Sequence, residues 1–92
     1  MYYVYILKSL KDNGIYTGYT TDIDDRLNRH FKGQVIATKN RLPLKLVVYF
    51  TFPDKSKASK FERYLKTGSG RAFINKHFIW KENRHYGDFL LY

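Results

Sequence analysis

The chain has 92 residues, among them nine Tyr, seven Phe, one Trp and no Cys. A chain of this length forms one domain with a small core, and the absence of Cys excludes a disulfide framework and a thiolate metal site. Seventeen Lys and Arg against eight Asp and Glu leave a formal net charge of +9, which favours an anionic partner, most often nucleic acid.

The first two predicted elements are strands over Val4–Leu7 and Gly14–Tyr19. An Asn-Gly pair lies between them, and it is a strong hairpin signal because both residues tolerate a positive φ. The hairpin would bring together Tyr5 and Tyr16, which are eleven residues apart. Alternation places Gly18 on the face of Tyr16, where its bare backbone would form the floor of a site. An ordinary β-bulge at Gly18 is the alternative.

A first helix is predicted to begin at a cap provided by Thr21 or Asp22 and to end at Gly33. Arg26 and His30 are four residues apart, so they would lie together on one flank of its apolar stripe. The plain alternative is that the two residues are solvated neighbours on the helix surface.

A loop over residues 34–43 follows and carries the basic residues Lys39 and Arg41. Leu44–Phe52 is rich in Val and aromatic residues and nearly free of charge. Such a run is typical of a strand that is buried on both faces, so we expect this strand at the centre of the sheet.

A second helix is predicted after Pro53, with Asp54 or Ser56 as its cap. Glu62 is its only acid and borders the buried face. A surface pair with Lys66 is the plain explanation of this acid, and such a pair is worth only ~0.3–0.5 kcal/mol. The basic residues around Glu62 are Lys57, Lys60, Arg63 and Lys66.

Residues 67–70 are predicted to break the helix, and Arg71–Phe78 to form a short third helix. The order strand, strand, helix, strand, helix, helix predicts a small α/β sandwich. In it, a three-stranded, mainly antiparallel sheet is flanked by three helices. Residues 1–80 would form this domain, and residues 81–92 a C-terminal tail of unknown role.

Several of these residues, taken in order, resemble the GIY-YIG nuclease superfamily. The match is closest to its small stand-alone bacterial members, the excinuclease C-subunit-like (UPF0213-type) proteins. Each motif alone is weak, whereas the ordered set, with spacings of eleven, ten and four residues before a distant Glu, is specific. The residues that carry the resemblance are Tyr3-Val4-Tyr5, Tyr16-Thr17-Gly18, Arg26, His30 and Glu62.

The chain departs from the family motifs at strand positions. Tyr3 and Val4 replace the Gly and Ile of the first motif, and Thr17 replaces the Ile of the second. These substitutions leave the two tyrosines in place. Asn75 lies thirteen residues after Glu62 and is matched to the asparagine near the end of the family's domain.

The resemblance implies metal-dependent hydrolysis of a DNA phosphodiester. Glu62 would hold Mg²⁺ or Mn²⁺, which accept hard oxygen ligands, and Arg26 would grip the phosphate. Tyr5 is the preferred general base, although the choice between Tyr5 and Tyr16 stays open. His30 would hold or relay the proton near neutral pH.

The charge and the resemblance together predict DNA as the partner, with cleavage directed by DNA structure rather than sequence, in repair or processing. A protein partner could recruit the chain to DNA. A non-catalytic nucleic-acid-binding module and a module that docks an acidic protein are the alternatives. No apolar run approaches the ~20 residues of a membrane span, so we expect a cytoplasmic protein. The residues predicted to contact DNA are Gly18, Lys39, Arg41, Lys60, Arg63, Lys66 and Arg71.

Overall fold

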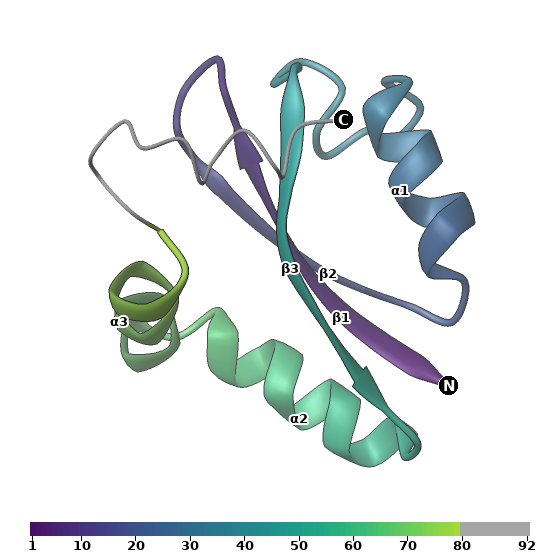
Figure 1. The fold of residues 1–92 in the computed structure, drawn as a ribbon, viewed down its shortest axis with the longest axis vertical. Helices are drawn as coiled ribbons and strands as arrows, with labels where there is room; N and C mark the ends of the chain where they lie inside the picture. Colours follow the sequence, from purple (N-terminus) through teal and green to yellow (C-terminus); the bar gives the residue numbers. More distant parts are fainter. Residues whose placement is uncertain (80–92) are drawn as a thin grey trace.

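The computed structural model of the chain describes residues 1–79. A three-stranded sheet lies between α1 on one side and α2 with α3 on the other (Figure 1). This architecture confirms the predicted α/β sandwich, and the predicted tail over 81–92 lies outside the described residues. In chain order the elements are β1 (Tyr2–Ser9), β2 (Ile15–Thr20), α1 (Ile23–Phe31), β3 (Leu44–Phe52), α2 (Lys55–Leu65) and α3 (Gly68–His77).

The sheet has the order β2-β1-β3, and both strand pairs are antiparallel. The prediction that Leu44–Phe52 is the central strand is therefore wrong, because β1 occupies the centre. Val4–Leu7 of β1 are fully buried, whereas Tyr49 of β3 is 48% exposed and Thr51 is also exposed. An edge strand with partly exposed aromatic side chains gives the same apolar run as a buried central strand, so the run could not separate the two.

The hairpin between β1 and β2 forms where the sequence predicts it. Asn13 has φ 60°, so the turn uses a positive φ at this residue. The backbone N–H of Ser9 donates to the carbonyl of Gly14 at 2.9 Å, and that of Asn13 donates to the carbonyl of Ser9 at 2.9 Å. These bonds fix the register that sets the two motif tyrosines on neighbouring strands.

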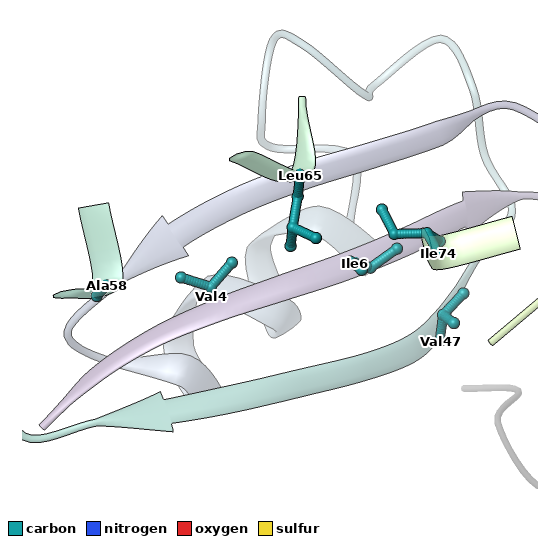
Figure 2. Close-up of a cluster of buried hydrophobic side chains, with 6 residues drawn as sticks. All are labelled: Val4, Ile6, Val47, Ala58, Leu65 and Ile74. Carbon is teal, nitrogen blue, oxygen red and sulfur yellow. The ribbon is translucent and has the colours of Figure 1, made fainter. Parts of the chain in front are cut away.

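The two faces of β1 belong to two different cores. One core packs β1 and β3 against α2 and α3, and its side chains point toward one another in Figure 2. The other core packs the opposite face of the sheet against α1, with Tyr5, Leu7, Leu44 and Leu46 at its centre. The candidate site lies on this second face. The buried members of the first core are Val4, Ile6, Val47, Ala58, Leu65 and Ile74.

Side-chain caps set where the helices begin. Asp22 caps α1, and Asp54 caps α2 by accepting a hydrogen bond from the backbone N–H of Ser56 at 2.8 Å. Thr67 caps α3, which begins three residues before the predicted start at Arg71. The predicted break between the two helices is present but shorter than predicted, because residues 68–70 form the first turn of α3. A Cβ there would overlap the backbone at the end of α2, so glycine permits the tight packing of the two helices.

Candidate active site

Tyr5 lies at the centre of the candidate site, in the middle of β1. Gly18 of β2 is directly opposite it in the strand register. A Cβ on Gly18 would overlap the phenol ring of Tyr5, so the glycine makes room for this ring. Gly18 was expected to leave an open floor, but it is buried beneath Tyr5 and seats the ring. The irregularity in the sheet lies between Ile6 and Leu7 in the pairing with β3, not at Gly18.

Three rings from three elements form a cluster on this face. The ring centroids of Tyr5 and Tyr16 are 6.3 Å apart, and those of Tyr5 and His30 are 5.4 Å apart. The rings of Tyr16 and His30 are 5.1 Å apart. Tyr5 and His30 are fully buried, while Tyr16 keeps part of its surface exposed. The cluster therefore has a buried interior and one partly exposed phenol.

A series of hydrogen-bonded polar side chains extends inward from the cluster. The Tyr5 hydroxyl lies 2.8 Å from Nε2 of His30, and Nδ1 of the same ring lies 2.8 Å from Oγ1 of Thr38. Thr38 is fully buried although it belongs to the loop between α1 and β3. Sequence reasoning missed this residue, because a loop has no periodicity that distinguishes a buried threonine from an exposed one.

The environment shifts the pKa of both buried groups. Burial, and then the positive charge of Arg26, lower the pKa of His30 to about 4, so its imidazole is neutral at pH 7. Burial, and then Tyr16, raise the pKa of the Tyr5 phenol, while Arg26 opposes this rise and Glu62 adds to it. Arg26 and Glu62 therefore both influence the charge of this phenol, and the influence of Glu62 is the smaller.

Arg26 belongs to α1, which covers the face of Tyr5, and Glu62 belongs to α2, which covers the opposite face of the sheet (Figure 1). The Glu62 carboxylate is 3.2 Å from Nζ of Lys66, and the two side chains are 22% and 55% exposed, respectively. The i, i+4 pair considered as the plain explanation of Glu62 is thus present. It contributes little to stability at this exposure, and it leaves the carboxylate within reach of solvent.

Glu62 could bind a divalent metal ion only if the ion kept most of its water ligands. Within residues 1–79 there is no group of three or more His, Cys, Asp or Glu side chains that could hold a metal ion. Mg²⁺ usually retains several waters and binds proteins through one or two carboxylates together with substrate phosphates. The single half-buried carboxylate of Glu62 suits such a hydrated ion. The ion could bind once Lys66 moved away from this carboxylate.

Asn75 and Arg71 lie apart from the ring cluster, on α3. Together with Ile15 and Ile74 they line a shallow pocket. α3 covers the face of the sheet opposite to that of Tyr5. The structure thus groups Tyr5, Tyr16 and His30 in one ring cluster, with Arg26 on the same helix as His30. Glu62 on α2 and Asn75 on α3 belong to the helices that cover the opposite face of the sheet.

Of the seven residues predicted to contact DNA, Gly18 is buried and Lys66 is paired with Glu62, and the other five fall into two groups. Arg41 is half-buried and its Nε is 3.2 Å from the Asp12 carboxylate, while its carbonyl accepts a hydrogen bond from Ser9 Oγ at 2.6 Å. Arg41 thereby ties the loop over residues 34–43 to the β1–β2 turn. The four that remain exposed without a described ion pair are Lys39, Lys60, Arg63 and Arg71.

Comparison with known proteins gives matches over most of the chain. A family model described as the GIY-YIG catalytic domain matches residues 1–78. The UPF0213 protein BH0048 of Halalkalibacterium halodurans is 44% identical over 71 residues, which cover 76% of this chain and 74% of that protein. The UPF0213 protein SH2523 of Staphylococcus haemolyticus is 45% identical over 69 residues, which cover 74% of this chain and 83% of that protein.

A solved structure also matches the fold. The solution NMR structure of the UPF0213 protein BH0048 from Bacillus halodurans has a TM-score of 0.52 and 38% sequence identity, and the match covers 83% of this chain and 84% of that one. Within the described residues, no helix is long and apolar enough to cross a membrane. The resemblance seen in the motifs is confirmed: this chain belongs to the GIY-YIG catalytic domain family, whose domain is of the nuclease type.

Proposed function

We propose that the chain is a divalent-metal-dependent DNA endonuclease that acts in DNA repair or processing and selects its substrate by DNA structure. One observation carries the proposal above all: the Tyr5, Tyr16 and His30 rings pack together, and Arg26 and Glu62 act on the phenol at their centre. Simple binding of DNA does not require an acid, since a carboxylate repels phosphate. An acid and an arginine that both influence one buried phenol suit phosphodiester hydrolysis.

Arg26 would hold the phosphate through its guanidinium group, which pairs with phosphate oxygens and stabilises the charge that develops on them. It is partly exposed, so the phosphate can approach it. A Mg²⁺ or Mn²⁺ ion held by Glu62 would supply further positive charge for the phosphoryl oxygens. Lys66 would then leave Glu62 and become free to contact DNA.

The two tyrosines differ in burial, and this difference bears on which of them could act as the general base. A group that takes a proton from the attacking water must touch that water. Tyr5 is fully buried and burial raises its pKa, whereas Tyr16 is partly exposed. These properties favour Tyr16 as the base, with Tyr5 and His30 behind it, and they reverse the preference for Tyr5 drawn from the sequence.

The test is cleavage of end-labelled linear, nicked and branched DNAs with and without Mg²⁺ or Mn²⁺. Wild type is compared with Glu62→Gln and with Asp24→Asn, a control that neutralises an exposed acid of α1. We expect metal-dependent cutting that Glu62→Gln abolishes and Asp24→Asn retains, with DNA binding kept by both. Tight binding without cutting by any of the three proteins would contradict the proposal and support a non-catalytic DNA-binding module.

A further inference from the structure

Thr38, His30 and Tyr5 are joined by a buried series of hydrogen bonds. All three residues are fully buried, and the two links between them are each 2.8 Å long. At this length each link is a hydrogen bond, so each contains one donor and one acceptor. A neutral imidazole has one N–H and one acceptor nitrogen. Once the donor is known in one of these hydrogen bonds, the donor in the other therefore follows.

Thr38 fixes the donor direction. Among the described residues its hydroxyl has one partner, Nδ1 of His30. If Nδ1 carried the proton, Thr38 Oγ1 would accept it, and the hydroxyl hydrogen would be buried with no acceptor. An unmade hydrogen bond of a buried donor is costly. If the hydroxyl donates to Nδ1 instead, its hydrogen is satisfied and only lone pairs remain unused.

The hydrogen bonds of Tyr5, at the other end of the series, fit the same donor direction. With Nδ1 as acceptor, the imidazole proton is on Nε2, and it is donated to the Tyr5 oxygen. Unlike Thr38, Tyr5 has a second hydrogen-bonding neighbour, the phenol of Tyr16, whose ring is 6.3 Å away. Tyr5 can therefore accept from His30 and donate its own hydrogen to Tyr16. Burial raises the pKa of Tyr5, and hydrogen bonding with Tyr16 raises it further, as expected when the protonated Tyr5 is the donor.

We infer that Thr38 is a positioning residue: its hydroxyl donates to Nδ1 and holds His30 as the Nε2–H tautomer. Every donor in this series of hydrogen bonds then points toward Tyr16. His30 is then a hydrogen-bond donor to Tyr5 and not the acceptor of its proton. If Tyr16 is the base, which rests on the proposed function, this series of hydrogen bonds stabilises negative charge on the Tyr16 oxygen. Thr38 would thus support catalysis without touching the substrate.

The loop around Thr38 holds it in place for this role. The backbone N–H of Thr38 donates to the carbonyl of Val35 at 3.1 Å, and its own carbonyl accepts from the backbone N–H of Arg41 at 2.9 Å. Arg41 is in turn paired with Asp12 in the β1–β2 turn. Bonds on both sides fix the Thr38 backbone, so its hydroxyl is presented to His30 in one position.

The first test needs no DNA. Two-dimensional ¹⁵N–¹H NMR that correlates the ring nitrogens of His30 with its carbon-bound protons identifies the tautomer in the wild-type protein at pH 7. We expect a protonated Nε2 and an unprotonated Nδ1. A protonated Nδ1 would overturn the inference. Because wild type is measured, the result does not depend on whether any variant folds.

Two variants then test the part played by the Thr38 hydroxyl. Thr38→Val removes the donor at nearly constant shape, Thr38→Ser keeps it, and Thr51→Val is the control at an exposed threonine. Thr38→Val should shift the Nδ1 resonance toward that of a free acceptor and lower kcat roughly tenfold, the effect of one lost hydrogen bond, while Thr38→Ser and Thr51→Val do neither. An unchanged Nδ1 resonance in Thr38→Val would contradict the inference. A wild type that has the expected tautomer but does not cut DNA would sustain the inference and defeat the proposed function.

Discussion

The Tyr5 hydroxyl lies 2.8 Å from Nε2 of His30, and neither residue is exposed to solvent. This contact joins the central strand of the sheet to α1 through a polar pair that lies next to the apolar side chains of the second core. A buried polar pair is tolerated only when its members satisfy each other. The contact therefore bears on stability as well as on the site, and the two effects can be measured separately.

Removal of the Tyr5 hydroxyl should destabilise the fold. Tyr5→Phe keeps the ring and leaves Nε2 of His30 without a partner, which costs about 1–3 kcal/mol for a buried polar group. Tyr2→Phe is the matched control, because Tyr2 is partly exposed and has no described side-chain hydrogen bond, and it should change stability by less than ~0.5 kcal/mol. Urea denaturation gives both free energies of unfolding, and equal values for the two variants would count against the buried contact.

The buried imidazole should make the fold sensitive to acid. The pKa of His30 is lowered from 6.5 to about 4 in the folded state. The unfolded chain therefore binds the extra proton first, and stability is lost as the pH falls from 6.5 to 4, by up to ~1.4 kcal/mol per pH unit. The free energy of unfolding of wild type and of His30→Gln should be measured across this range. The difference between the two proteins should shrink with falling pH, and a constant difference would contradict the lowered pKa.

Gly18 should not tolerate a side chain. A Cβ at this position overlaps the Tyr5 ring, so Gly18→Ala forces the ring to move and should cost about 1–3 kcal/mol as an overpacked core does. Gly68→Ala is the control, because nothing lies within 4 Å of a Cβ there. That change should be neutral or stabilise by up to ~1 kcal/mol. Thermal unfolding compares them, and a Gly18→Ala protein as stable as wild type would show that the ring is not held against the glycine.

The exposed cations and Arg41 should differ in their effect on DNA binding. Lys60→Ala or Arg63→Ala should each reduce the slope of log affinity against log salt concentration by about 0.9 if the residue contacts a phosphate of duplex DNA. Arg41→Ala should instead lower stability and leave the slope unchanged, because the Arg41 side chain is paired with Asp12 in the β1–β2 turn. Titrations at several salt concentrations distinguish the two classes. A slope that changes only in Arg41→Ala would reverse the assignment.

The sequence predicted the arrangement of Tyr5 and Tyr16 because alternation and a strong turn signal are local properties of a hairpin. The pairing of Arg26 with His30 on α1 followed from helical spacing in the same way. Thr38 could not be predicted, because its burial depends on a loop that is anchored to residues far away in the chain. The edge position of β3 was also missed, since strand order depends on tertiary packing, which the apolar run does not specify.

The role of Tyr16 is tested most directly by single-turnover cleavage of the preferred DNA by wild type and by Tyr16→Phe, with DNA binding measured in parallel. If Tyr16 is the base, its loss should lower the cleavage rate by about 100-fold or more and leave the affinity for DNA nearly unchanged. A Tyr16→Phe protein that cuts DNA at the wild-type rate would show that this ring cluster is not the catalytic centre.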